Sequence, residues 1–176
     1  MVAELLVREA KAEDTARIAH IGAAAMRVQY AGLVDPTAVD AAIAQTYSAE
    51  AVGDCIRLCM RTHTAEFLVA ERQNDVIGYL HFDRFGPEPE LHRLYVDADQ
   101  RGGGVGALLM DELHARLKDP HYMLLVVTGN DRAVAFYKRQ GLRIERRVDG
   151  LEYYRERMGV AFPEGTEPFD LVLMRR

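Results

Sequence analysis

A glycine-rich run near the middle of the chain has the spacing of an anion-binding loop. It reads Arg101-Gly102-Gly103-Gly104-Val105-Gly106-Ala107 and follows the mostly apolar stretch from Glu90 to Val96 after a short turn. A strand that leads through such a run into a helix directs several backbone N–H groups, and the positive end of the helix dipole, to one point. Glycines permit close approach of a ligand and left-handed backbone angles. The run therefore predicts a phosphate-binding loop at a helix start.

Dinucleotide-binding proteins offer one interpretation of these glycines. Gly102, Gly104 and Ala107 satisfy the G-x-G-x-x-G/A fingerprint, and Asp131 lies near the position of a ribose-binding acid. That fold places its fingerprint after the first strand of a parallel unit, whereas about three expected strands precede the run here. The chain beyond the run is also short for the second half of such a fold. A dinucleotide-binding protein stays open as an alternative.

A second segment resembles a known family motif. Residues 130–142 read NDRAVAFYKRQGL and resemble the N-x-x-A-x-x-F-Y-x-x-x-G-F segment of the GNAT family of N-acetyltransferases, with Leu142 as the one departure. Arg101 to Gly106 resembles the R/Q-x-x-G-x-G/A pyrophosphate signature of the same family. The two signatures occur in the family's order with an expected strand between them. The resemblance implies an acetyl-CoA-dependent enzyme in which a primary amine attacks directly in a ternary complex.

The resemblance also implies where acetyl-CoA binds. The backbones of Leu94, Tyr95 and Val96 would pair with the pantetheine arm along a strand splayed from its neighbour by a bulge. The N–H of Val96 or Leu94 would donate to the acetyl oxygen. The run from Arg101 to Ala107 would hold the pyrophosphate. Asn130 would bond the pantetheine arm or cap its own helix, and both roles stay open.

Proton transfer is assigned to two side chains. Tyr137 is the family's usual general acid for the leaving thiolate, and the alternative is an aromatic residue packed in the core. Glu90 begins its strand at the position of the catalytic glutamate in the histone-acetylating branch, so we expect a general base or an amine-attracting group there. Strand alternation places Glu90, His92 and Leu94 on one face, which makes His92 a second candidate base. A surface ion pair is the alternative for both.

These residues need a framework of strands and helices. Apolar patterning predicts a single α/β (α+β) domain over residues 1–176, with a mixed, mostly antiparallel central sheet of about seven strands flanked by helices. The family resemblance implies that this sheet contains one splayed strand pair. Asp149-Gly150 predicts a turn. The segment 151–168 has no clear pattern, and a substrate-facing lip or an oligomer contact, as in a homodimer, is expected there.

Composition limits the function classes. The formal net charge of −5 argues against a nucleic-acid surface and agrees with a cationic acceptor. No apolar run approaches the ~20 residues of a membrane span, and Met1 to Glu4 lacks the basic start of a leader, so a cytoplasmic protein without membrane contact is expected. Cys55 and Cys59, even with His63, fit no zinc spacing, so no metal is expected.

The acceptor stays open among a polyamine, an amino acid, an antibiotic and a protein N-terminus. A module that senses acetyl-CoA without turnover is the non-enzymatic alternative.

Overall fold

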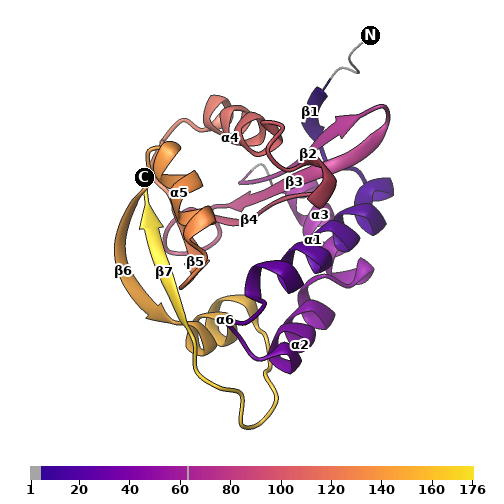
Figure 1. Ribbon diagram of the computed structural model, residues 1–176. Helices are drawn as coiled ribbons and strands as arrows, with labels where there is room; N and C mark the ends of the chain where they lie inside the picture. Colours follow the sequence, from indigo (N-terminus) through magenta and orange to yellow (C-terminus); the bar gives the residue numbers. More distant parts are fainter. Residues whose placement is uncertain (1–4, 63) are drawn as a thin grey trace.

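A central sheet of seven strands organises the computed structural model, which describes residues 5–62 and 64–176 (Figure 1). The strand order is β1-β2-β3-β4-β5-β7-β6. The pairing of β4 with β5 is parallel and the other pairings are antiparallel, which confirms the predicted mixed sheet. The strands are β1 (Leu5–Glu9), β2 (Ala65–Arg72), β3 (Asp75–Asp83), β4 (Glu90–Val96), β5 (Met123–Val127), β6 (Arg143–Asp149) and β7 (Asp170–Arg175).

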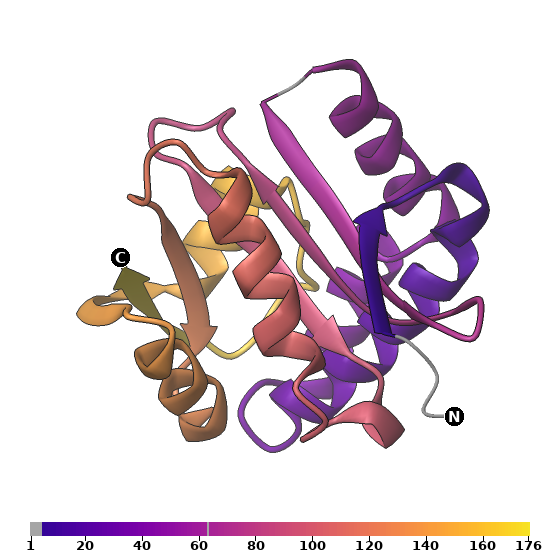
Figure 2. The same cartoon turned by 90° about the horizontal axis from the view of Figure 1, so that it is seen from above.

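Helices cover both faces of this sheet. Helices α1, α2, α3 and α6 lie on one face, and α4 and α5 lie on the other (Figures 1 and 2). The apolar side chains of each group belong to a separate core cluster. Cys55 and Cys59 pack against the first cluster as free thiols, and His63 lies outside the described residues. The α-helices are α1 (Thr15–Tyr30), α2 (Pro36–Thr46), α3 (Ala49–Arg61), α4 (Val105–Arg116), α5 (Asp131–Arg139) and α6 (Gly150–Met158).

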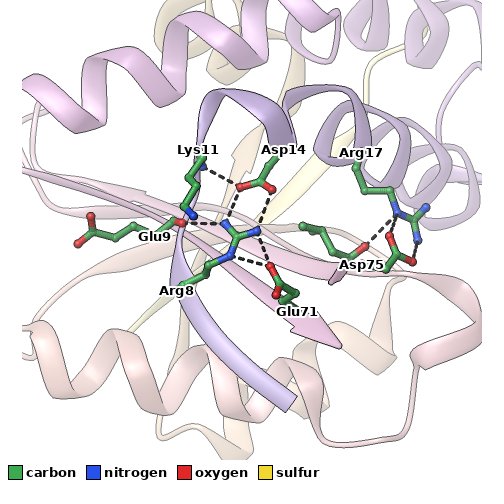
Figure 3. Close-up of polar contacts among 8 residues, drawn as sticks. Arg8, Glu9, Lys11, Asp14, Arg17, Glu71 and Asp75 are labelled. Atoms are coloured by element: carbon green, nitrogen blue, oxygen red, sulfur yellow. Dashed lines mark hydrogen bonds and ion pairs between the residues drawn. The ribbon is translucent and has the colours of Figure 1, made fainter. Parts of the chain in front are cut away.

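An arginine fixes the first strand to the start of the helical layer. Arg8 donates two hydrogen bonds to the carboxylate of Asp14, at 2.7 and 2.9 Å, and a third to Glu71 on β2 at 2.7 Å (Figure 3). Asp14 also accepts from the backbone N–H of Lys11 at 2.7 Å. The carboxylate of Asp14 thus ties β1 to the entry of α1, and it makes no side-chain cap bond to α1 itself.

The prediction of a turn at Asp149-Gly150 is wrong. Asp149 is instead the N-cap of α6, because its side chain accepts a hydrogen bond from the N–H of Glu152 at 2.8 Å. Aspartate is common both at helix N-caps and in hairpin turns, so the Asp-Gly dipeptide alone does not distinguish between the two. The cap turns the chain from β6 into a helix that reaches back beneath β4.

Within residues 5–62 and 64–176, no helix is both long and apolar enough to cross a lipid bilayer.

Candidate functional site

Strands β4 and β5 separate almost as soon as they meet. Their register contains one pair, Glu90 with Met123, and Leu94 to Val96 pair with β3 on the other side only. A cleft of about 590 Å³ opens between the diverging strands. It runs from β4 past the glycine loop to α5, and its walls include Leu94, Tyr95, Val96, Arg101, Gly102, Gly104, Val105, Gly106, Ala107, Asn130 and Tyr137.

The backbone of β4 presents free hydrogen-bonding groups to this cleft. Asp97 donates its N–H to the carbonyl of Ile77 on β3 at 2.9 Å. Backbone groups of successive strand residues point to opposite sides, so the N–H groups of Val96 and Leu94 point away from β3 and toward the opening. Arg101 Nε, at 3.2 Å, donates to the Val96 carbonyl, which lies on this same side. Arg101 thus borders the cleft while bonded to β4.

The glycine loop has the conformation that an anion site requires. Gly102 and Gly104 have φ angles of +85° and +80°, in the left-handed region that favours glycine. A Cβ at either position would meet no other atom within 4 Å, so the space above the loop is open. Leu108 donates to Gly104 at 3.0 Å as the first regular turn of α4, which leaves the N–H groups of residues 105–107 for an external acceptor. These features fit a pyrophosphate.

Helix α5 contributes the two residues expected from its motif. The Asn130 side chain accepts from the N–H of Ala133 at 3.2 Å, which is the capping role, and Asn130 also lines the cleft. Tyr137 lies partly buried on the cleft wall, packed against the α4 side of the core. Burial raises the pKa of Tyr137 above its ordinary value, so the phenol keeps its proton at neutral pH.

Glu90 is enclosed by three partners. Its side chain is 1% exposed, and its carboxylate accepts from the hydroxyl of Tyr153 and from Arg157 Nη2 at 2.9 Å, both on α6. His92 Nδ1 lies 3.3 Å from the same carboxylate. Burial alone would raise the pKa of Glu90, but His92, Tyr153 and Arg157 outweigh it and hold this pKa below its usual range. Glu90 is therefore an ionised, fully engaged group.

His92 sits at a bulge in β4. His81 on β3 faces Arg93, and the next residue, Phe82, faces Leu91, so His92 has no partner in this register. The extra residue shifts the alternation, and the expectation that Glu90, His92 and Leu94 share a face is wrong for Leu94. Glu90 and His92 do lie together, with His92 Nδ1 3.3 Å from the Glu90 carboxylate. Leu94 packs on the α4 side of the sheet.

The ring of His92 is held between two carboxylates. Its Nε2 lies 2.8 Å from Asp83, and its Nδ1 faces Glu90. Burial disfavours the charged ring, but these two carboxylates prevail and raise the pKa of His92 to about 9. A ring that is charged at pH 7 is a poor acceptor for a proton from the amine.

Helix α6 supplies residues that were not predicted from the sequence. Tyr153, Tyr154 and Arg157 reach the site from the segment that had no clear pattern, and the hydroxyl oxygen of Tyr154 lies 2.6 Å from that of Tyr30 on α1. The Asp149-x-x-Glu152 spacing was the available signal, since an acid three residues after a capping residue is typical of a helix start.

Comparisons with known proteins agree with this geometry. The sequence profile described as the Acetyltransferase (GNAT) family matches residues 36–142. Among solved structures, a PaiA N-acetyltransferase from Thermoplasma acidophilum in complex with coenzyme A has a TM-score of 0.78 at 19% identity, with 98% of each chain covered. A ribosomal-protein-alanine N-acetyltransferase from Brucella melitensis has a TM-score of 0.70 at 24% identity, with 97% of this chain and 98% of the other covered.

A third likeness is YncA, a putative acetyltransferase from Salmonella typhimurium with its cofactor acetyl-CoA. It has a TM-score of 0.69 at 16% identity, covering 99% of this chain and 94% of the other. At such identities these likenesses establish the fold. None of the curated proteins matches this sequence. A mostly antiparallel sheet with the glycine run after its fourth strand also excludes the dinucleotide-binding fold.

Proposed function

The chain belongs to the acetyltransferase (GNAT) family, and we propose that it transfers acetyl from acetyl-CoA to a primary amine that attacks directly in a ternary complex. The parting of β4 from β5 after Glu90 and Met123 carries this proposal. It leaves an open strand edge that leads to the start of α4, which is the shape that an extended arm ending in a diphosphate needs.

Binding of acetyl-CoA is assigned to backbone groups on this path. The N–H groups of Leu94 and Val96 face the cleft and can pair with an extended amide-containing arm. Gly102 to Ala107 present the N–H groups and the helix dipole that favour a pyrophosphate, and Arg101 adds positive charge at the cleft wall. Tyr95 contributes its backbone to the strand, while its ring packs in the core on the α1 side.

The transfer itself requires a polarised thioester carbonyl, a proton donor for the leaving sulfur and an acceptor for the proton that the amine releases. When bound, acetyl-CoA supplies a thioester whose C–S bond breaks as the C–N bond to the amine forms. The N–H of Val96 or Leu94 donates to the carbonyl oxygen in the cleft and stabilises the charge that develops there. Tyr137 delivers its phenolic proton to the leaving sulfur and recovers a proton from solvent. The proton released by the amine passes to water.

Glu90 is assigned a positioning role in this scheme. A carboxylate that is 1% exposed, ionised, bonded to Tyr153 and Arg157 and close to His92 is less suited to accept a proton than to hold β4, His92 and α6 in place. The role of direct base, which the sequence suggested for Glu90, is therefore not part of our proposal. No covalent enzyme intermediate is required, so Cys55 and Cys59 take no part.

Thiol release from acetyl-CoA in the presence of a panel of primary amines tests the proposal. Amine-dependent release that falls in Tyr137→Phe supports it. Tight binding of acetyl-CoA with no release for any amine would instead indicate a sensing module. Release that does not depend on an amine would indicate slow hydrolysis and would contradict amine transfer.

A further inference from the structure

A small cavity adjoins the cleft on the α1 side of β4. Its volume is about 40 Å³, which by the space that one water requires is enough for a few waters or for a single carboxylate group. The cavity and the cleft share part of their walls, so the two spaces meet where β4 and β5 part. The shared residues are Gln29, Leu91, His92, Tyr95 and Leu125.

Arg93 lines this cavity and is 5% exposed. Its Nη2 donates to the Thr46 carbonyl at 3.3 Å, and its guanidinium lies 4.8 Å from the centroid of the Tyr47 ring. Its Nε and Nη1 are buried, and neither has a hydrogen-bond partner among residues 5–62 and 64–176. A buried guanidinium with two free donor groups is costly, because arginine cannot shed its charge.

The charges around the cavity do not balance. His92, Arg93 and Glu90 line the cavity, and Arg157 and Asp83 pair with Glu90 and His92 from outside it, so that three cations lie in this cluster with two carboxylates. The carboxylate of Glu90 is paired with His92 and Arg157, and the carboxylate of Asp83 is paired with His92. Within the described chain this leaves the positive charge of Arg93 without a counterion.

We propose that the amine acceptor carries a carboxylate, which enters this cavity and pairs with Arg93 while the amine lies in the cleft. The inference rests on the proposed acetyl transfer and narrows its acceptor to amino carboxylates of the amino-acid class. A carboxylate in the cavity would give the guanidinium of Arg93 the counterion that it lacks among the described residues and would neutralise the excess charge. The hydroxyl-bearing side chains of Tyr47 and Tyr153 on the cavity wall provide further polar surroundings.

A polyamine fits this cavity poorly. Its second ammonium would approach the unpaired cation of Arg93 in a buried setting, where repulsion between like charges is weakly screened. The net charge of −5 for the whole chain attracts cations at long range. At the cavity, however, the unpaired charge of Arg93 is positive and repels them. The cavity therefore selects against the acceptor class that the overall charge suggests.

A matched set of acceptors tests this proposal. Each of several L-amino acids is compared with its own amide and its decarboxylated amine, with spermidine added, and kcat/KM is measured by thiol release. The wild type is expected to prefer the free carboxylate by on the order of 10- to 100-fold, the range of a charged hydrogen bond. Arg93→Met should abolish that preference and leave the decarboxylated amines within about threefold of the wild type. Arg27→Met, at an exposed arginine paired with Asp40, should retain it.

Binding without turnover provides the second measurement. Amino acids, in the presence of coenzyme A, should raise the melting temperature of the wild type and of Arg27→Met but not of Arg93→Met. This shift is expected even if no thiol is released, so failure of acetyl transfer and failure of the carboxylate assignment are distinguishable. Equal kcat/KM for all three forms of each acceptor, or a preference for spermidine, would overturn the proposal. So would an Arg93→Met variant that loses all acceptors in equal proportion, because the arginine would then be structural only.

Discussion

Arg157 Nη2 on α6 lies 2.9 Å from the carboxylate of Glu90, so one ion pair joins the C-terminal helix to the point where β4 and β5 part. The glutamate is 1% exposed, whereas 29% of the arginine side chain is exposed. Through this contact α6 takes part in the site, although no motif in its sequence indicates such a role. It also means that stability and site geometry are coupled through a single carboxylate.

Replacement of Arg157 by methionine should therefore destabilise the protein. The buried carboxylate of Glu90 would lose a charged partner but keep Tyr153 and His92, so we expect a loss of about 1–3 kcal/mol in the free energy of unfolding. Urea denaturation measures this loss. Arg155→Met, at an exposed position of the same helix, should change stability by less than about 0.5 kcal/mol. Equal effects of the two substitutions would contradict a specific role for the ion pair.

Removal of the Tyr137 hydroxyl should affect the chemical step. Loss of a general acid lowers rates by about 10²- to 10⁴-fold, so Tyr137→Phe should reduce kcat within that range with little change in KM for acetyl-CoA. Because burial raises the pKa of Tyr137, the wild type should show no loss of kcat from its ionisation below about pH 10. Tyr122→Phe is the matched control, since that hydroxyl bonds His114 at 2.9 Å outside the cleft. A Tyr137→Phe enzyme with wild-type kcat would remove the residue from the mechanism.

Alanine substitutions at two glycines with the same φ angle can distinguish the effect of backbone strain from an effect on ligand binding. Gly104 in the glycine loop and Gly165 in the loop before β7 both have φ of +80°, and an added Cβ at either meets no described atom within 4 Å. Alanine at each position should cost a similar ~1–2 kcal/mol of stability from the left-handed backbone. Only Gly104→Ala should also raise KM for acetyl-CoA, by on the order of 10-fold, because its methyl enters the cleft. A comparable rise in Gly165→Ala would show that general destabilisation is the cause.

The stability of the protein should depend on pH through His92. Its pKa is raised from an ordinary 6.5 to about 9 in the folded state, so its contribution is complete below pH 6.5 and is lost as pH rises through 9. Integrated over that window, the shift corresponds to on the order of 3 kcal/mol. Burial and the nearby cations hold the pKa of His81 well below 6.5, so His81 does not titrate in the folded protein over this range.

The unfolding free energies of wild type and His92→Gln, measured from pH 6.5 to 9, test this expectation. The wild type should lose stability across the window, and the variant should lose clearly less. Parallel curves would show that His92 is not held as a cation by Asp83 and Glu90.

Local signals in the sequence were sufficient for the fold, and they located the candidate path for the cofactor, which stays a prediction. Alternating and helical periodicities mark β4, α4 and α5 because each reflects a neighbourhood of a few residues. Gly102 and Gly104 identify the candidate phosphate loop because glycine readily adopts the left-handed angle that both have. The family resemblance carried by the glycine run and the second motif implies the splayed strand pair, and the single pair of Glu90 with Met123 has the form expected of it.

The surroundings of the reacting groups were decided by tertiary structure. Glu90 meets Tyr153 and Arg157 across 63 and 67 residues of chain, and no local pattern encodes such a distant contact. The bulge at His92 arises from pairing with β3, and it reverses the alternation on which a prediction from sequence depends. An arginine in a strand is ordinarily solvated or paired. Only the packing against α2 shows that Arg93 is buried with two donor groups that have no partner among the described residues, because burial and pairing are properties of the assembled fold.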